Sequence, residues 1–410
     1  MKLLHLADLH LGKNVNGFSM IADQAYILEE ILALAEKEKA DGVLLAGDIY
    51  DRSVPSEEAV ALFDSFLTKL AGLNKQVFVI SGNHDSEERL QFGSRLFQAN
   101  GIYIAGKYKG TLPCIDVADE YGPLHIWLLP YIRASQVAHY FPEKAIKTYE
   151  DAVRAAMEAS PLNQSERNVL LLHQFVTGSD RSDAGRPALE NSGVDAGAVP
   201  KKPELAGSEG FGLSVGTIEQ ISADCFAAFD YVAMGHIHSA QAVGRETCRY
   251  AGSPLKYSLQ EREIHQEKTV PLVTLCEKGS VTVELLPLKP RREVRRLRGT
   301  LRQLLEHAPR NSAFSDSNDA EDYIYATLTD ETVQFEAMAR LQEVYPNTMK
   351  LDYDNQETRS LQEWDGRIET EGKGFAELIE EFYTMIYGGK PTEADWKLLE
   401  DVAREAEVIG

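Results

Sequence analysis

The stretch VFVISGNHD, residues 77–85, decides the fold. An apolar, β-branched run ends in a glycine and then in polar side chains, which predicts a buried strand with Asn83 and His84 at its carboxyl end. The same construction occurs twice earlier, in KLLHLADLHLG (residues 2–12) and in VLLAGD (residues 43–48). Each of these strands ends in polar or ionisable residues. This predicts a sheet with a functional site at the carboxyl ends of its strands.

Helical patterns alternate with these strands. Apolar residues recur with helical spacing near 23–39, 56–71 and 86–98. This alternation predicts an α/β fold with helices outside a sheet. Further strand-like runs lie at 125–130, 168–173, 230–238, 269–275 and 281–287.

The length of 410 residues predicts two or three domains. We expect a first domain over 1–280, in which the segment 178–210, rich in Gly, Ser, Asp, Ala and Pro, is a mobile insertion. A strand and helix pattern over 281–350 predicts a small α+β unit. Residues 351–374 are polar, with charges of both signs, and indicate a linker.

Residues 375–410 carry two amphipathic helical patterns. The apolar residues from Phe375 to Ile386 fall on one helical face, and Thr392 with Asp395 forms a capping box before the second helix. The segment is shorter than the roughly 40 residues that usually fold unaided, so its apolar faces need another surface. That surface is either the chain's own first domain or a partner protein.

Composition excludes several classes of protein. Apolar residues make up 43% and charged residues 26%, and no apolar run approaches the roughly 20 residues of a membrane helix. His5, Asp8 and His10 interrupt the first apolar run, so we expect no signal peptide. The four cysteines lie far apart without a C-x-x-C pair, which predicts the reduced thiols of a cytoplasmic protein rather than disulfides or a zinc site.

The formal net charge of −22 argues against a nucleic-acid partner, because DNA binding depends on Lys and Arg side chains that neutralise phosphates. A local basic stripe weakens this argument. A solvated surface and a DNA contact both remain open for it. Its members are Lys289, Arg291, Arg292, Arg295, Arg296, Arg298 and Arg302.

Five short segments, most of them at the end of a predicted strand, contain ligands for hard metal ions. Each segment alone also fits a cap, a turn or a packed imidazole. Together they offer oxygen and nitrogen donors and no thiolate, a set that suits two divalent cations such as manganese with one shared carboxylate. The seven donors are Asp8, His10, Asp48, Asn83, His173, His236 and His238.

These segments resemble the calcineurin-like metallophosphoesterase superfamily, whose pattern D-x-H, G-D, G-N-H, H and G-H-x-H is matched completely. Within it the chain is similar to the SbcD family of bacterial nuclease subunits, through SGNHDSEERL (81–90), YAGSPLKYSL (250–259) and the appended domains. The resemblance implies a metallophosphoesterase β-sandwich flanked by helices, a small α+β domain that caps DNA, and a C-terminal helical hairpin. It also implies one metal on Asp8, His10 and His238, another on Asn83, His173 and His236, and Asp48 as the bridge.

The resemblance further implies roles for residues beside the donors. His84 would face the phosphate, as a cationic stabiliser or as the proton donor to the leaving oxygen. Asp51 would supply a carboxylate that contacts His84 and orients its ring, without binding a metal itself. Arg52 and Arg89 would contact the phosphate, with a strand-end salt bridge as the alternative for Asp51 and Arg52.

The implied activity is that of a manganese-dependent DNA nuclease. It would act as an exonuclease on double-stranded ends and as an endonuclease on single-stranded or hairpin DNA, in repair and recombination. The implied partners are a second copy, giving a homodimer, and an SbcC-type coiled-coil ATPase bound by residues 375–410, giving a heterotetramer. DNA would be contacted in part by Arg291, Arg292, Arg295, Arg296 and Arg298.

Two alternatives stay open. The same donors could serve an enzyme for another phosphodiester or for a phosphoprotein, because function depends on the surroundings of a site. Protein phosphatases usually carry GDxVDRG and GNHE, whereas Ser53 follows Arg52 and Asp85 follows His84 here. A non-catalytic scaffold would be expected to have lost donors, and none is missing.

Overall fold

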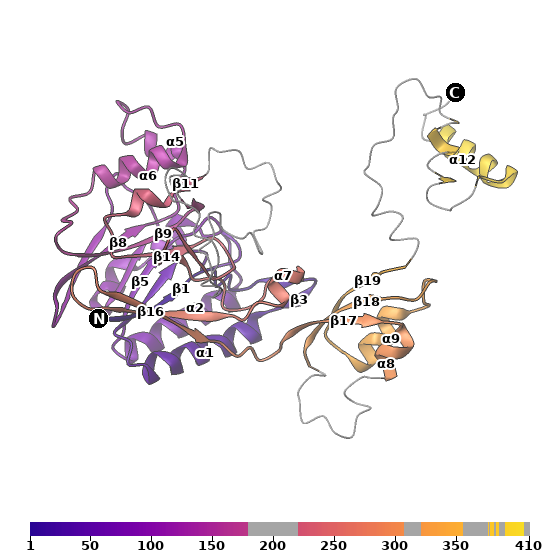
Figure 1. Cartoon of the computed structure of the whole chain (residues 1–410), viewed down its shortest axis with the longest axis horizontal. Helices are drawn as coiled ribbons and strands as arrows, with labels where there is room; N and C mark the ends of the chain where they lie inside the picture. Colours follow the sequence, from indigo (N-terminus) through magenta and orange to yellow (C-terminus); the bar gives the residue numbers. More distant parts are fainter. Residues whose placement is uncertain are drawn as a thin grey trace, which may run out of the picture. The chain divides into compact units, whose positions relative to one another are not determined.

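The computed structural model describes residues 1–178, 220–306, 321–355, 376, 378–380, 383–384 and 390–405. The chain divides into two units, Met1–Glu293 and Val294–Gly410 (Figure 1). Residues 179–210 of the insertion expected at 178–210, and residues 356–374 of the linker expected at 351–374, lie outside the described residues. No helix within the described ranges is both long and apolar enough to cross a membrane.

The first unit is built on two six-stranded sheets. In one sheet four strands run parallel, and two more continue its edge in antiparallel pairing. The parallel strands are β1 (Lys2–Leu6), β4 (Gly42–Ala46), β5 (Gln76–Ile80) and β6 (Ile102–Ala105), and the added strands are β15 (Thr269–Leu275) and β16 (Val281–Pro287).

The second sheet has four parallel strands between two antiparallel edge strands. The parallel strands are β8 (Gly122–Leu129), β9 (Arg167–His173), β12 (Tyr231–Gly235) and β14 (Arg245–Tyr250), and the edges are β7 (Cys114–Asp119) and β13 (Gln241–Val243). Short pairs of strands lie outside both sheets: β2 (Asn14–Val15) with β3 (Phe18–Ser19), and β10 (Val176–Thr177) with β11 (Ile221–Ser222).

The two sheets pack face to face, and the alternation within β8 shows how. Leu124, Ile126 and Leu128 point into the core between the sheets, with Leu44 and Phe78 among their neighbours. The intervening apolar residues of β8 belong to a second core on the outer face of the same sheet. A strand buried on both faces reads as a continuous apolar run, as β8 and β9 do. The α/β fold predicted from the sequence is confirmed.

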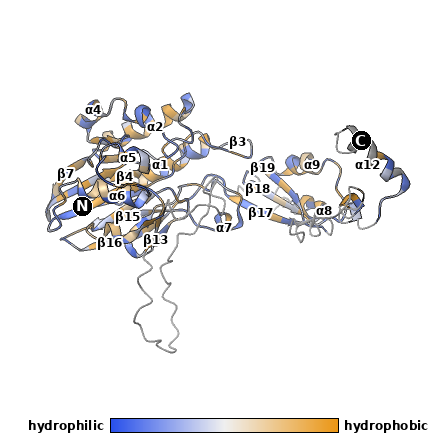
Figure 2. Cartoon of the chain, turned by 90° about the horizontal axis from the view of Figure 1, so that it is seen from above, coloured by the Kyte–Doolittle hydropathy of each residue, from blue (hydrophilic) through white to orange (hydrophobic). Residues whose placement is uncertain are grey.

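Helices cover the outer faces of the sandwich, and Figure 2 shows that they carry both hydrophobic and hydrophilic residues. The helix expected near 86–98 is broken into two, because Gly93 takes a left-handed φ of 74° between them. The helices are α1 (Ile21–Lys37), α2 (Glu57–Gly72), α3 (Glu87–Gln91), α4 (Ser94–Phe97), α5 (Ala134–Ala138), α6 (Tyr149–Glu158) and α7 (Glu261–Ile264), with 3-10 turns η1 (Gln98–Asn100) and η3 (Ala223–Phe226).

The second unit contains a three-stranded parallel sheet, ordered β17-β18-β19, with two helices on one face. Leu304, Ile324, Ala326 and Leu341 form its core. Its elements are β17 (Val294–Gly299), α8 (Leu301–Glu306), β18 (Tyr323–Leu328), α9 (Ala337–Val344) and β19 (Thr348–Tyr353), followed by α12 (Glu393–Glu405).

Two details of the chain's organisation bear on the sequence analysis. The strand β16, which lies after the expected boundary at residue 281, pairs with β15 of the first unit, so the structure divides later, after Glu293.

The predicted cap of the last helix is confirmed. The Asp395 N–H donates to Thr392 Oγ1 (3.3 Å), and the Thr392 N–H donates to Asp395 Oδ2 (2.8 Å).

Candidate metal centre

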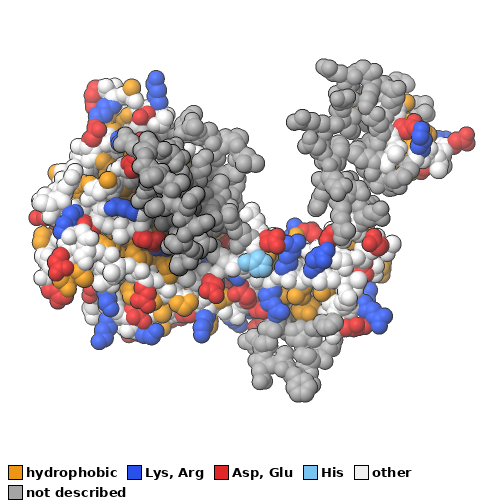
Figure 3. Space-filling model, viewed as in Figure 1, with side chains coloured by type: hydrophobic (Ala, Val, Ile, Leu, Met, Phe, Trp, Pro, Cys, Tyr) orange, Lys and Arg blue, Asp and Glu red, His pale blue; other side chains and the backbone are white. Residues whose placement is uncertain are grey.

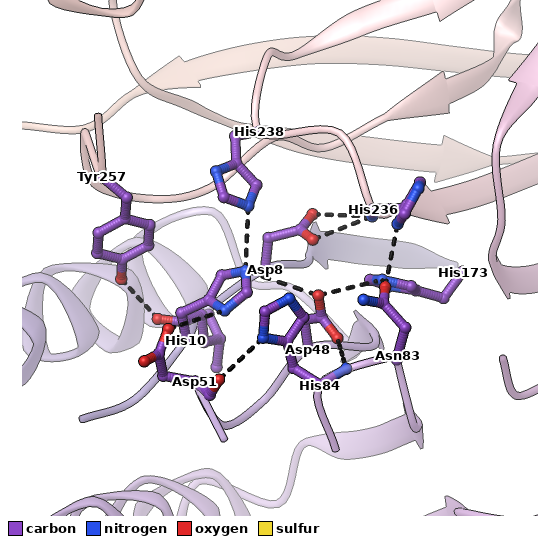
Figure 4. Close-up of polar contacts among 12 residues, drawn as sticks. Asp8, His10, Asp48, Asp51, Asn83, His84, His173, His236, His238 and Tyr257 are labelled. Atoms are coloured by element: carbon purple, nitrogen blue, oxygen red, sulfur yellow. Dashed lines mark hydrogen bonds and ion pairs between the residues drawn. The ribbon is translucent and has the colours of Figure 1, made fainter. Parts of the chain in front are cut away.

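Loops at the carboxyl ends of β1, β4, β5, β9 and β12 meet at one edge of the sandwich (Figure 4). Strands of both sheets contribute, and this edge is where an α/β arrangement places its sites. The structure brings together all seven donors predicted from the sequence, which we call the donor cluster. They are Asp8, His10, Asp48, Asn83, His173, His236 and His238.

The backbone of the donor cluster is bent in an uncommon way. Asp8, His10, Asp48 and His236 have φ values of 53°, 44°, 50° and 100°, in the left-handed region that side chains other than glycine rarely adopt. Hydrogen bonds hold the first two, because the Asp8 N–H donates to Gly47 O and the His10 N–H donates to Asp48 O, both at 3.0 Å. Such strain persists only where the surroundings enforce it, and it gathers at functional sites.

Two glycines make room for this arrangement. A Cβ at Gly82 would lie 2.1 Å from Asp48 Oδ1, and a Cβ at Gly235 would lie 2.0 Å from Ala46 O. Any larger residue at either position would push the loops apart. The glycines of GNH and GHIH therefore serve the close approach of strands and side chains.

The first half of the donor cluster consists of Asp8, His10 and His238. His10 Nε2 lies 3.0 Å from His238 Nε2, and a carboxylate oxygen of Asp8 lies within 4.8 Å of a ring nitrogen of each. Both imidazole rings thus direct a nitrogen to one place, beside a carboxylate. The His236 N–H donates to both oxygens of Asp8, at 3.0 and 3.2 Å, and fixes that carboxylate.

The second half consists of Asn83, His173 and His236. His173 Nε2 and His236 Nδ1 each lie 3.1 Å from Asn83 Oδ1. His173 Nδ1 lies 2.8 Å from Ala46 O, which can only accept, so Nδ1 carries the proton and Nε2 presents its lone pair to the cluster. A backbone carbonyl of this kind commonly sets the tautomer of a metal ligand.

Asp48 lies between the two halves. Its Oδ2 is 3.6 Å from His10 Nε2 and 3.3 Å from His173 Nε2, and its Oδ1 accepts from the His84 N–H at 2.9 Å. Burial by itself would raise the pKa of Asp48, but His173 and His10 hold that pKa well below its usual range. One ionised carboxylate therefore faces both groups of nitrogens.

The donor set fits divalent cations. Burial raises the pKa of Asp8 to about 6, even with His173 nearby, and burial lowers the pKa of His236 to about 3. Burial opposes protonation of His173, but Asp48 raises the pKa of His173 to about 9, so a proton on that imidazole offsets the buried carboxylate where no cation does. A divalent cation can take the place of this proton. Nitrogen and oxygen donors without sulfur suit borderline-hard metal ions.

His84 stands beside this cluster on its partly exposed side. Its Nδ1 lies 2.8 Å from the main-chain oxygen of Asp51, and its ring meets that of His10 edge to face, with 4.8 Å between centroids. The carbonyl fixes the proton on Nδ1, which leaves Nε2 as the ring nitrogen for substrate chemistry.

The structure differs from the expectation for Asp51. Its carboxylate does not orient His84; Oδ1 instead accepts from Lys13 Nζ at 2.9 Å and lies 3.5 Å from His10 Nδ1. The Asp51 N–H also donates to Leu11 O at 3.2 Å, so both the main chain and the carboxylate of Asp51 contact the loop after β1. Burial opposes ionisation, but the contacts with His10 and Lys13 lower the pKa of Asp51 to about 2.

The predicted phosphate-contact arginines lie outside the donor cluster. The Arg52 side chain is 78% exposed, and its Nε is 3.7 Å from Asp51 Oδ2, the geometry of a loose ion pair. Arg89 is exposed on α3. Neither residue contacts a donor among the described interactions, so the structure leaves their phosphate role as a prediction.

Residues that no sequence motif marked support the donor cluster through hydrogen bonds. Asp85 accepts from the N–H groups of Ile49 (3.1 Å), Tyr50 (2.9 Å) and Gly82 (2.9 Å), and so ties two ligand loops together. The Tyr257 hydroxyl donates to Leu9 O at 2.5 Å, beside the rings of His10 and His238 (Figure 4). Tyr257 belongs to the run YAGSPLKYSL, whose resemblance to SbcD chains was its only signal.

A buried lysine holds His238. Lys268 Nζ donates to His238 O (3.0 Å), to Ser253 Oγ (3.0 Å) and to Glu263 Oε1 (3.1 Å). The Glu263 and Lys268 side chains are 0% and 6% exposed. No sequence motif marked this pair, because its members fall in a region without a recognisable pattern.

The basic stripe is divided between the two units. Lys289, Arg291 and Arg292 end the first unit, and the other members lie on β17 and α8 of the second. Most of the arginines already contact acidic or aromatic side chains. These contacts are Arg292 with Asp23 (2.8 Å), Arg295 with Asp322 (3.4 Å), Arg298 with Asp354, Arg302 with Glu306 (2.7 Å), and Arg296 over the Tyr325 ring (5.0 Å).

Comparisons with known proteins agree with this geometry. Residues 1–240 match the calcineurin-like phosphoesterase family, and residues 290–387 match the type 5 capsule protein repressor C-terminal domain. The SbcD subunit of the SbcCD nuclease of Staphylococcus epidermidis is 30% identical over 389 residues, which cover 93% of this chain and 92% of that protein. A dimetal phosphatase from Danio rerio overlaps weakly, with 12% identity and a TM-score of 0.36 over 72% of this chain and 97% of its own.

The match to the calcineurin-like phosphoesterase family covers more than half of the chain and includes every donor loop. The run YAGSPLKYSL and Lys268 lie after the matched residues. The full-length similarity to a nuclease subunit extends through the second unit. The chain therefore belongs to the calcineurin-like phosphoesterase family, in its SbcD branch of nuclease subunits, and is a metal-dependent phosphodiesterase.

Proposed function

We propose that this chain is a manganese-dependent DNA nuclease that cuts double-stranded ends as an exonuclease and single-stranded or hairpin DNA as an endonuclease. The observation that carries the proposal is the position of Asp48, whose Oδ2 faces His10 on one side and His173 on the other. This is the arrangement of a carboxylate that serves two cations. The full-length similarity to a nuclease subunit supports a nucleic acid as the substrate, and we propose that this nucleic acid is DNA.

In this proposal each half of the donor cluster holds one cation, and Asp48 serves both. When bound, the cations supply a nucleophile near neutral pH and offset the charge of the phosphodiester. The chain's own residues position the donors. Backbone hydrogen bonds hold Asp8 and His10, and Lys268 donates a hydrogen bond to the carbonyl of His238. Manganese fits because the donors are nitrogen and oxygen atoms.

His84 completes the proposed mechanism. Asp51 O holds the Nδ1 proton, so Nε2 is presented to the departing oxygen of the DNA strand. A protonated Nε2 would stabilise the phosphate charge and give its proton to that oxygen. Asp51 takes part through its carbonyl on His84 and through its carboxylate on His10.

The second unit, over most of the proposed capping domain 281–350, is proposed to contact the DNA backbone. Arg296 and Arg298 lie two positions apart on β17, so they share one face of the sheet, and both are exposed. Figure 3 shows Lys and Arg side chains on this unit beside Asp and Glu side chains, which does not make a continuous basic patch. Contacts with a few phosphates fit this surface better than a wide electrostatic groove does.

Two protein partners belong to the proposal. Residues 375–410 would bind an SbcC-type coiled-coil ATPase, and the described helix α12 exposes Leu398 (65%) and Val402 (56%). A second copy would pack on helices near the front of the chain, where Phe92 and Leu96 are 83% and 77% exposed. Together these contacts give a homodimer and, with the ATPase, a heterotetramer.

The test uses the purified full-length chain on end-labelled duplex, hairpin and single-stranded DNA, with manganese, magnesium or chelator. We expect manganese-dependent cleavage of all three DNAs and none with chelator. A phosphopeptide and a small chromogenic phosphodiester run beside them cover the alternative substrates. Turnover of either of these, with all three DNAs left intact, would replace the DNA nuclease with another phosphoesterase.

A further inference from the structure

A second group of metal-ligating side chains lies on the edge strand β7, apart from the donor cluster. Cys114 and Asp116 are two positions apart on β7 and so share one face, and His125 on β8 is the cross-strand partner of Asp116. Cys114 Sγ and His125 Nδ1 lie 3.6 and 2.6 Å from the same oxygen, Asp116 Oδ1. Sulfur, oxygen and nitrogen donors therefore converge on one point.

Glu166 adds a second, independent feature. It lies just before β9, and its Oε2 is 2.8 Å from His125 Nε2, on the side of the ring away from Asp116. A histidine that binds a metal through one nitrogen usually donates its other N–H to a carboxylate. Glu166 can thus hold the tautomer in which Nδ1 presents its lone pair toward Cys114 and Asp116.

We propose that Cys114, Asp116 and His125 bind one divalent cation of the zinc class, with Glu166 as a positioning residue and a water as the fourth ligand. A thiolate favours zinc over manganese, so this site would select a different metal from the sulfur-free donor cluster. Cys114 and His125 are partly buried and Asp116 is exposed, which leaves a route for the ion. The site would fasten the edge strand β7 to its neighbour β8.

Without a cation the same residues form an ordinary ion pair. Protonated His125 would join Asp116 and Glu166, and burial together with Asp116 raises the pKa of Cys114 to about 12. The cation must therefore displace a thiol proton and an imidazole proton. The spacing of the cysteines predicted no zinc site, because the three donors come from two paired strands and not from one C-x-x-C segment.

Cobalt is the probe that separates this site from the donor cluster. The full-length chain is first loaded with Mn²⁺ and then titrated with Co²⁺, and the thiolate-to-cobalt charge-transfer absorption is recorded. No member of the donor cluster contains sulfur, so this absorption reports a cysteine alone. We expect it to saturate at about one equivalent. Cys114→Ser should abolish it, and the matched control Cys225→Ser, at another partly buried cysteine, should leave it unchanged.

Glu166→Gln should retain the absorption and weaken Co²⁺ affinity about 10- to 100-fold, as expected for a residue that positions a ligand. Zn²⁺ should displace Co²⁺ and raise the Tm of the unchanged chain but not of Cys114→Ser. No absorption in the unchanged chain, or an absorption that survives Cys114→Ser, would overturn the proposal. Manganese-dependent DNA cleavage by each variant shows that it is folded, and either result here leaves the nuclease proposal standing.

Discussion

The main-chain oxygen of Asp51, not its carboxylate, holds His84, at 2.8 Å from Nδ1. The carboxylate of the same residue is directed to His10 and Lys13. One residue therefore supports two functions through different atoms. A substitution at Asp51 removes only the carboxylate and leaves the carbonyl in place, so the two functions can be separated by experiment.

Asp51→Ala should weaken metal binding and spare the chemistry. Loss of the carboxylate removes its contact with the His10 ring and its ion pair with Lys13, whose side chain is 3% exposed. We expect the manganese affinity to fall about 10- to 100-fold, with the maximal rate largely restored at saturating manganese. Cleavage rates across a manganese titration measure both quantities. A low rate that excess manganese cannot restore would place the carboxylate in the reaction itself.

His84→Ala should show the reverse pattern. Removing a positioned proton donor costs about 10²- to 10⁴-fold in rate. Bound metal should stay near two equivalents, because His84 is not one of the seven donors. Metal content of the dialysed variant, set against its single-turnover rate, checks this. If metal is lost together with activity, His84 is a ligand.

Asp48→Asn should affect both metal positions, whereas Asp8→Asn should affect one. Asp48 Oδ2 faces His10 and His173, while Asp8 belongs to the half with His10 and His238. Calorimetric titration with Mn²⁺ should lose both binding events in the first variant and retain one in the second. Equal losses in the two variants would contradict the bridging position of Asp48.

Lys268→Met should destabilise the chain. Glu263 is fully buried, and removing its partner leaves an uncompensated charge, which typically costs about 3–5 kcal/mol. The free energy of unfolding in denaturant measures this loss. The double variant Lys268→Met with Glu263→Gln should recover part of the stability, because no buried charge is left. No recovery would mean that the hydrogen bond to His238 O dominates.

Replacing Arg296 and Arg298 by Gln should weaken DNA binding and reduce its dependence on salt. Each lost phosphate contact lowers the slope of log affinity against log salt by about one unit. The matched control is Arg154→Gln, an exposed arginine on α6 that lies outside the basic stripe and pairs with Glu150. Binding that is unchanged across a salt series would make the stripe a solvated surface.

Much of the architecture could be predicted because its determinants are local. Runs such as VLLAG and VFVISG bury both faces, and their length and flanking glycines distinguish them from helices. The sequence did not predict the break in the helix expected near 86–98, because a single glycine such as Gly93 also occurs within helices. The pairing of β16 with β15 was also missed, because pairing depends on residues far from the strand.

The sequence by itself determined which chemistry reaches the carboxyl edge: Asp8, Asp48, Asn83, His173 and His236 each lie within three residues of a strand end, and parallel strands bring such ends together. Only the tertiary structure decided which atoms face one another. Asp51 offers a carbonyl and a carboxylate, and the loop turn selects between them. Lys268 and Tyr257 reach the cluster through contacts that span 30 and 248 residues, and no local pattern encodes distances that exist only after folding.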